Sequence, residues 1–275
     1  MKDTKVLTIQ DISCVGQCSL TVALPIISAC GMECAVLPSA VLSTHTAGFK
    51  NYTVRDLSED FPAIRKHWES EGISFDAVYT GYLGSAAQIV DVKAVMESCM
   101  VPGGLRIVDP AMGDNGKLYP AFDLDYAKCM KTLCDTADIV LPNITEASFL
   151  TGIEYRESYD ESYVEKLCRA LGAKTVVLTG VGFRPGFTGV YVYENGKSWY
   201  YEHKRITEGC HGTGDVYAAA FTGALMNGKS VQQSARIAAD YVVLCIEHTK
   251  NYNNHWYGVK FEPVIPALID FIKAE

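Results

Sequence analysis

The chain alternates between short apolar runs and segments in which apolar residues recur at helical spacing. The short runs predict β-strands at residues 5–10, 33–38, 40–43, 76–80, 105–109, 138–141 and 174–179. The other segments predict helices at residues 20–30, 57–71, 85–99, 124–134, 146–150, 163–171, 213–226, 231–248 and 264–274. Residues 189–194 and 197–204 predict a hairpin, because Asn195-Gly196 between them is a strong signal for a type I′ turn.

The alternation of strands and helices predicts an α/β fold with a doubly wound, mostly parallel central sheet and helices on both faces. The chain contains no internal repeat, low-complexity tract or clear linker, so we expect a single domain over residues 1–275. An antiparallel excursion near residues 33–55 predicts a small flap at the edge of the sheet. Such sheets bind ligands at the carboxyl ends of their strands, so the loops at those ends are expected to carry the chemistry.

Composition restricts the partners and the compartment. The net charge is −8 and no block of Lys and Arg is present, so nucleic acid and membranes are poor partners. The uncharged run at residues 19–32, which contains Pro25 and Gly31, is too short to span a bilayer. Ten cysteines without a signal peptide predict a reducing, cytoplasmic environment rather than a disulfide framework. Cys14/Cys18 and Cys30/Cys34 are each four residues apart in apolar, core-like sequence, whereas zinc sites favour a C-x₂-C knuckle, so a metal site at these pairs is disfavoured.

The most informative motif is Gly212-Thr213-Gly214-Asp215, which runs directly into an apolar helix. Glycines allow a ligand to approach the main chain, and the N–H groups at a helix start attract anions. A carboxylate beside a bound anion suits phosphoryl transfer to a hydroxyl, because it can accept the proton of that hydroxyl. A simple turn followed by a helix cap explains the same residues, and both interpretations stay open at this point.

Polar residues also follow three later strands. Asp109 and Asp114 offer the carboxylates that Mg²⁺ prefers, although an exposed turn would use the same residue types. Asn143 and Glu146 have the spacing of a capping box, which explains them without a ligand; alternatively, both face a metal and phosphates. Thr179 ends a buried strand before two glycines, which suits close approach of a nucleotide.

A third group of residues predicts an acceptor pocket. Ser13 and Thr46 lie in loops after early strands, and Tyr82 follows a later strand. Hydroxyl groups beside an aromatic ring suit a small, flat, polar substrate, although ordinary turns have the same composition. The chain has no G-x-G-x-x-G after its first strand, no P-loop motif and no G-x-S-x-G elbow. A dinucleotide dehydrogenase, a P-loop enzyme and an α/β-hydrolase are therefore disfavoured.

Five of these motifs, in this order, resemble the ribokinase-like superfamily and, within it, the pyridoxal/pyridoxamine kinases. They are Leu42-Ser-Thr-His-Thr-Ala-Gly48, Thr80-Gly-Tyr82, Asp109-Pro-Ala-Met-Gly-Asp-Asn-Gly-Lys-Leu-Tyr119, Pro142-Asn-Ile-Thr-Glu146 and Gly212-Thr-Gly-Asp215. The resemblance implies ATP-dependent phosphorylation of the 5′-hydroxymethyl group of a B6 vitamer: pyridoxal, pyridoxine or pyridoxamine. It also implies Mg²⁺, a monovalent cation such as K⁺, and a homodimer.

The resemblance further implies a role for each site residue. Asp215 resembles the catalytic base, which also contacts the substrate. The anion hole under the transferring phosphoryl group corresponds to Gly212, Thr213 and Gly214. The nucleotide side corresponds to Asp109, Asp114, Asn143, Glu146, Thr179 and Thr213, of which Asp109, Asp114 and Glu146 are the expected metal ligands. Ser13, Thr46 and Tyr82 correspond to the side of the pyridine ring, and residues 112–122 to a flap over ATP.

One segment departs from the family pattern. After the first strand the family commonly has Ser-His-Val, a glycine-containing turn and then Gly-Asn, whereas residues 13–19 here are Ser-Cys-Val-Gly-Gln-Cys-Ser. The choice of vitamer therefore stays open, and a kinase for hydroxymethylpyrimidine or another small alcohol is an alternative. A non-catalytic protein that binds a vitamer or nucleotide is a second alternative. The retained Asp215, Asp109 and Glu146 favour catalysis.

Overall fold

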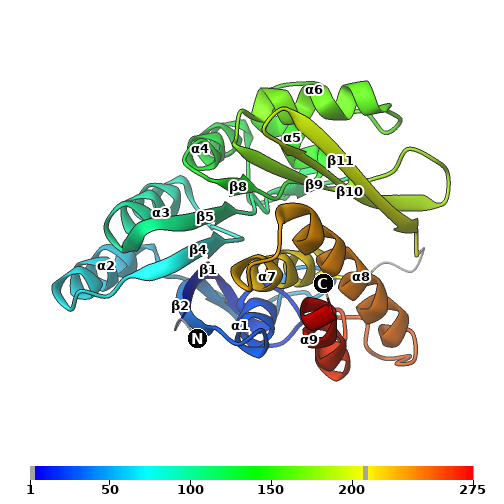
Figure 1. The fold of residues 1–275 in the computed structure, drawn as a ribbon. Coiled ribbons are helices and arrows are strands. Elements are labelled where there is room, and N and C mark those ends of the chain that lie inside the picture. The colour runs from blue at the N-terminus through cyan, green and yellow to red at the C-terminus, as the bar shows by residue number, and fades with distance from the viewer. Residues whose placement is uncertain (1–3, 207–209, 275) are drawn as a thin grey trace. The chain divides into compact units, whose positions relative to one another are not determined.

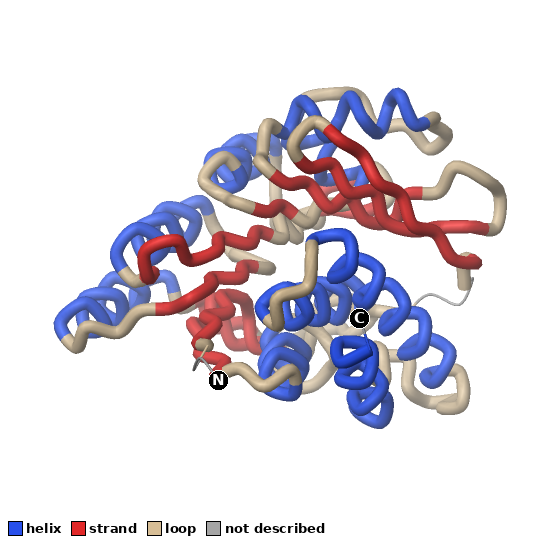
Figure 2. Tube along the Cα trace, in the orientation of Figure 1, coloured by secondary structure: helices blue, strands red, loops and turns tan. Residues whose placement is uncertain are grey.

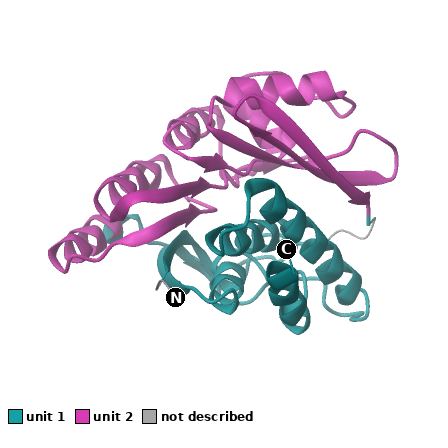
Figure 3. Ribbon diagram, in the orientation of Figure 1, with its two compact units in different colours: residues 1–60, 206–275 teal, residues 61–205 magenta. Residues whose placement is uncertain are grey.

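The computed structural model describes residues 4–206 and 210–274, and none of its helices is both long and apolar enough to cross a membrane. The chain divides into two compact units (Figure 3). The first comprises Met1–Asp60 and Ile206–Glu275, and the second comprises Phe61–Arg205. The predicted single domain of residues 1–275 has its ends outside the described residues and stays a prediction.

The first unit combines three hydrogen-bonded strands with helices from both ends of the chain (Figure 1). β1 (Lys5–Ser13) pairs in parallel with β2 (Glu33–Leu42), and α1 (Leu20–Ala29) connects them. β3 (Val54–Asp56) adds an antiparallel edge to β2, and the 3₁₀ helix η1 (Ser58–Asp60) follows it. The remaining helices are α7 (Thr213–Met226), α8 (Val231–Thr249), η2 (Glu262–Val264) and α9 (Ile265–Ala274).

The core of the first unit lies between α1, α7 and the strands. α7 packs against both α1 and α8, and residues 216–224 of α7 are all buried. A helix that is apolar on every side belongs in such an interior position. Ile26 and Ile27 of α1 and Phe221 of α7 are fully buried. The start of α7, which carries the most informative motif of the sequence, is therefore held by a well-packed helix.

The second unit contains a run of six hydrogen-bonded strands in the order β11-β10-β9-β8-β5-β4; strands are drawn in red in Figure 2. Its strands are β4 (Phe75–Thr80), β5 (Met100–Val108), β8 (Ile139–Val140), β9 (Thr175–Val181), β10 (Phe187–Glu194) and β11 (Lys197–Lys204). β4, β5, β8 and β9 are parallel, and β10 and β11 form an antiparallel hairpin on β9. The helices are α2 (Phe61–Ser70), α3 (Ala86–Ser98), α4 (Leu124–Cys134), α5 (Ile144–Thr151) and α6 (Glu161–Leu171).

The structure confirms the α/β class and most of the predicted elements. Asn195 and Gly196 both have positive φ, 51° and 77°, as the predicted type I′ turn requires. The predicted helix over residues 213–226 has the same bounds as α7. Two predicted helices begin with a separate 3₁₀ turn, η1 before α2 and η2 before α9.

Three strand predictions need correction. The predicted strands at residues 33–38 and 40–43 form the single strand β2, which continues through Pro38. Pro38 lies opposite Gln10, just before an irregularity in the β1–β2 register, where a missing N–H donor is tolerated. The predicted antiparallel excursion near residues 33–55 is reduced to β3, because β2 itself runs parallel to β1. Two short strands, β6 (Gly113–Asp114) and β7 (Lys117–Leu118), were not predicted.

Candidate active site

In the first unit, the predicted anion turn forms the N-terminus of α7. Gly212 is the N-cap residue and has φ of +78°, in the left-handed region that favours glycine. A methyl group on Gly212 would lie 1.8 Å from the carbonyl oxygen of Gln17, so no larger residue fits there. Thr213 and Gly214 open the helix, and Asp215 lies half-buried in its first turn. Sterics therefore require the glycine, and the helix start places a carboxylate beside N–H groups that attract anions.

The end of β1 brings a second carboxylate to this unit's site. Ser13, predicted on the ring side, is buried, and its hydroxyl donates a hydrogen bond of 3.0 Å to Asp11 Oδ2. Burial raises the pKa of Asp11, although hydrogen bonds from Ser19 and Ser13 oppose that rise. Burial also raises the pKa of the Cys18 thiol, and the charges of Asp215 and Asp11 raise it further. Because the charges of Asp11 and Asp215 both act on the Cys18 thiol, the two carboxylates lie around the same side chain.

Asp11 was missed as a site residue from the sequence. Its side chain is only 5% exposed and ends the same strand as Ser13, so a carboxylate at a strand end was the available signal. Thr46 is exposed, in the loop that follows β2, whereas Asp11 and Ser13 are buried.

In the second unit, Asn143 and Glu146 form the capping box that their spacing predicts at the start of α5. Asn143 Oδ1 accepts from the N–H of Glu146 at 2.9 Å, and Glu146 Oε2 accepts from the N–H of Asn143 at 2.9 Å. Glu146 Oε1 also accepts from the N–H of Met112 at 3.0 Å, and Asn143 Nδ2 donates to the carbonyl of Gly113 at 2.8 Å. The capping box therefore also anchors the base of the predicted flap, residues 112–122.

The flap itself begins with the β6–β7 hairpin. Asn115 and Gly116 form its turn, both with positive φ, and the N–H of Gly116 donates to Thr145 Oγ1 at 2.9 Å. Asp114 is exposed, and its carboxylate accepts from the N–H of Asn115 at 2.8 Å. An Asn-Gly pair thus forms this turn as it forms the turn at Asn195-Gly196. The hairpin was not predicted, because its strands have only two residues each.

An aromatic stack connects Tyr82 with the end of the flap. The ring of Tyr82 lies 5.3 Å from that of Phe122, and Phe122 stacks on Tyr126 at 3.9 Å between centroids. The hydroxyl of Tyr126 donates to the carbonyl of Leu83 at 2.6 Å, which fixes the stack to the loop after β4. Tyr82, predicted on the ring side, is therefore in contact with the last residue of the flap.

Two carboxyl groups and a hydroxyl lie at the carboxyl ends of β5, β8 and β9. Asp109 follows β5, and burial together with the charge of Glu146 raises its pKa well above the ordinary value. Burial raises the pKa of Glu146 to about 7, although hydrogen bonds from backbone N–H groups oppose that rise. Thr179 Oγ1 donates to the carbonyl of Pro142 at 3.3 Å, next to the Asn143 cap. Asp109, Asn143, Glu146 and Thr179 thus gather at one edge of this sheet, as predicted for a parallel arrangement.

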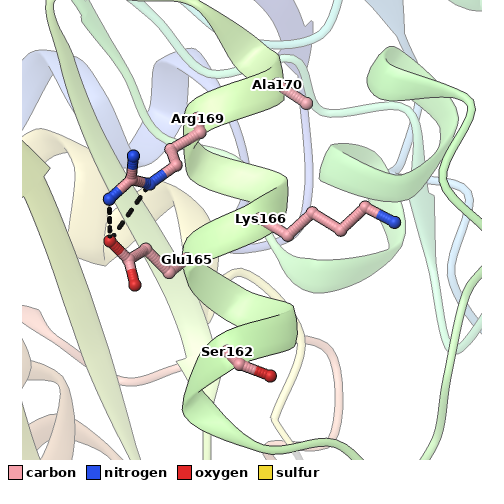
Figure 4. Close-up of a pocket in the computed structure, with 5 residues that line it drawn as sticks. All are labelled: Ser162, Glu165, Lys166, Arg169 and Ala170. Carbon is pink, nitrogen blue, oxygen red and sulfur yellow. Dashed lines mark hydrogen bonds and ion pairs between the residues drawn. The ribbon is translucent and has the colours of Figure 1, made fainter.

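A surface hollow on α6 lies apart from these groups (Figure 4). It has a volume of about 500 Å³ and is lined only by residues of that helix: Ser162, Glu165, Lys166, Arg169 and Ala170. Arg169 and Glu165 pair with each other there. No predicted site residue lines this hollow, so it is separate from the candidate site at the strand ends and at α7.

Known proteins that are similar to this chain in sequence or fold are kinases. A family model described as phosphomethylpyrimidine kinase matches residues 24–260. The chain belongs to the phosphomethylpyrimidine kinase family. It is therefore a phosphotransferase.

Relatives of this kinase carry two kinds of name. A pyridoxal kinase from Lactobacillus plantarum superposes with a TM-score of 0.91 at 32% identity, over 99% of each chain. A structure from Bacteroides thetaiotaomicron, named a phosphomethylpyrimidine kinase and crystallised with pyridoxal, gives 0.92 at 33% identity, over 97% of this chain and 96% of that one. The hydroxymethylpyrimidine/phosphomethylpyrimidine kinase of Bacillus subtilis is 29% identical, over 78% of this chain and 77% of its own. The resemblance to ribokinase-like pyridoxal kinases is thereby confirmed.

The carboxylates of this kinase can supply part of the coordination shell of a hard cation. Among the residues that the structure describes, no group of three or more His, Cys, Asp and Glu side chains is arranged to hold a metal ion. Both oxygens of Glu146 already accept backbone N–H groups, whereas Asp109 accepts one, from Ala111 at 3.1 Å. Mg²⁺ commonly uses one or two carboxylates and completes its shell with water and phosphates. Asp109 and Glu146 fit that requirement for a metal that arrives with a nucleotide.

Glu146→Gln is expected to flatten the pH dependence of this kinase's stability. Since the folded pKa of Glu146, about 7, exceeds its ordinary value of 4.5, the folded state binds the proton more tightly and loses stability as pH rises between those values. The loss of unfolding free energy between pH 5 and pH 8 should be about 1–3 kcal/mol smaller in the variant. Urea denaturation at both pH values measures it, and equal losses in variant and wild type would contradict the prediction.

Proposed function

We propose that the chain transfers the terminal phosphoryl group of ATP to the 5′-hydroxymethyl group of a B6 vitamer. The observation that carries this proposal is the start of α7. There, Gly212 adopts a left-handed conformation against the carbonyl of Gln17, and Asp215 lies in the first turn of the helix. A phosphoryl cradle next to a proton acceptor is the pair of groups that transfer to an alcohol needs.

Asp215 orients the acceptor hydroxyl and takes its proton late in the reaction. An alcohol is too weak an acid to be deprotonated in advance by a carboxylate, but in a loose transition state the proton can leave as charge shifts. The N–H groups of Gly212, Thr213 and Gly214 stabilise the charge on the transferring phosphoryl group. Ser13, Thr46 and Tyr82 face the ring of the substrate in this proposal.

The proposal also assigns residues to the nucleotide. They are Asp109, Asp114, Asn143, Glu146, Thr179 and Thr213. Asp109, Glu146 and Asp114 would hold Mg²⁺, which would supply positive charge against the phosphates. A monovalent cation such as K⁺, a homodimer and a cytoplasmic location belong to the same proposal.

A second candidate substrate is hydroxymethylpyrimidine. The first Bacillus subtilis relative carries hydroxymethylpyrimidine in its name, whereas another relative from that organism, 29% identical over 195 residues, is named a pyridoxine kinase. Both substrates are flat nitrogen heterocycles with a hydroxymethyl group, so one cradle and base serve either. The Bacteroides structure with pyridoxal supports the B6 vitamer as the first candidate.

A panel of acceptors tests the proposal. The purified enzyme is incubated with ATP, Mg²⁺ and K⁺, and with pyridoxal, pyridoxine, pyridoxamine or hydroxymethylpyrimidine, and phosphorylated product is measured by mass spectrometry. We expect a kcat/KM for at least one B6 vitamer about tenfold or more above that for the pyrimidine. A preference for hydroxymethylpyrimidine would support the second candidate, and no product with any of the four would refute both.

A further inference from the structure

His45 lies at a junction of several segments in the first unit. Its ring is only 4% exposed, so it is held on all sides. Nε2 lies 2.7 Å from the carbonyl oxygen of Tyr257, and Nδ1 accepts a hydrogen bond of 3.1 Å from the N–H of Ala47. The two bonds together require the neutral ring with its hydrogen on Nε2, because Nδ1 acts as an acceptor.

Hydrogen bonds made by His45 hold the backbone on both sides of Thr46. The N–H of His45 donates to the carbonyl of Val15 at 3.2 Å, and the N–H of Ala47 donates to the ring. Thr46 between them is exposed. A methyl group on Gly16 would lie 2.1 Å from the ring of His45, so the turn after β1 packs tightly on it. The conformation of the loop around Thr46 therefore depends on where this ring is held.

The carbonyl of Tyr257 connects the ring to the anion turn. It accepts a second hydrogen bond, of 3.3 Å, from the N–H of Gln17. The carbonyl oxygen of Gln17 is in turn the atom against which Gly212 packs. The path from Thr46 to Gly212 thus runs through His45, Tyr257 and Gln17. We call these last three residues the Tyr257 hub.

The local turn alone does not explain a histidine at this position. An asparagine side chain can accept the N–H two residues on and close the same turn. Only the second ring nitrogen reaches Tyr257, more than two hundred residues away in the sequence. Compared with an asparagine, the histidine at position 45 therefore adds the hydrogen bond to Tyr257.

We propose that His45 is a positioning residue, and that its bond to Tyr257 sets the acceptor loop at Thr46 relative to the phosphoryl cradle at Gly212. The proposal rests on the proposed function, in which Thr46 faces the acceptor and Gly212 faces the phosphoryl group. Alignment of two reacting groups is sensitive to displacements of about 1 Å, so loss of this bond should weaken use of the acceptor.

Two substitutions separate the two bonds of His45. In His45→Asn, the short amide keeps the acceptor for Ala47 and loses the bond to Tyr257. In His45→Gln, the longer amide keeps a donor for Tyr257 and loses the acceptor for Ala47. We expect kcat/KM for the acceptor to fall about tenfold or more in His45→Asn and to stay within about threefold in His45→Gln. The KM for ATP should change by less than about twofold in both.

The reverse order, with His45→Gln impaired and His45→Asn normal, would overturn the proposal. So would equal effects on the acceptor and on ATP, since these indicate a general loss of structure. Amide hydrogen exchange provides a readout that needs no activity: exchange at Gln17 should accelerate in His45→Asn and not in His45→Gln. If the wild type phosphorylates no acceptor of the panel, the proposed function fails, and the exchange at Gln17 still decides whether the hub exists.

Discussion

Replacing Asp215 with asparagine is expected to lower kcat by about 10²–10⁴-fold, the usual contribution of a positioned general base. The side chain lies in the first turn of α7, which the cradle at Gly212 to Gly214 begins. Asparagine keeps the size and the helical position of the residue but cannot accept the proton as the alcohol becomes phosphorylated. The KM of the acceptor should change by only a few fold, because binding of the ring depends on other residues.

The matched control for this experiment is Asp270→Asn. It makes the same chemical change on the exposed face of α9, in the same unit, and should leave kcat unaltered. Steady-state kinetics of both variants with the preferred acceptor give the comparison, and thermal melting verifies that each is folded. If Asp215→Asn turns over within about threefold of the wild type, Asp215 is not the base, and the role of the carboxylate at α7 must be reassigned.

The parts of the fold that were predicted correctly have strong local signals. α7 begins directly after Gly212 and is apolar from Val216 onward, so both of its ends were predicted to the residue. The hairpin at Asn195-Gly196 joins two strands of eight residues each, long enough for their pattern to show. The hairpin at Asn115-Gly116 joins strands of two residues each, in which no alternation can develop, and it was missed.

The site residues were harder to assign, because one side chain can serve two purposes. Glu146 fits a capping box and a metal site equally well by spacing, and the structure shows the cap together with a contact to the flap that no spacing rule predicts. Asp11 and His45 were missed for a related reason. Their partners Ser19 and Tyr257 come from other segments, and only the folded chain brings them together.

The second large effect is expected from Gly212→Ala. The new methyl group would lie 1.8 Å from the carbonyl oxygen of Gln17 and 3.0 Å from its carbonyl carbon. Both are backbone atoms, so no rotation of a side chain relieves the clash, and the turn itself has to move. The left-handed φ of +78° adds about 1 kcal/mol of strain for any residue with a Cβ atom. Since a shift of about 1 Å in a catalytic group can cost 10²-fold in rate, we expect kcat to fall about 100-fold or more.

Gly228→Ala is the matched control, because it introduces the left-handed backbone strain without a steric clash. Gly228 follows the other end of α7 with a φ of +86°, and a methyl group there would meet no heavy atom within 4 Å. This control should lose about 1 kcal/mol of unfolding free energy and retain its kcat, whereas Gly212→Ala should lose both stability and kcat. Urea denaturation and steady-state kinetics of the two variants make the comparison. Equal stability losses with unchanged kcat in both would mean that the contact between Gly212 and Gln17 does not set the phosphoryl cradle, and the Tyr257 hub would then have no path to it.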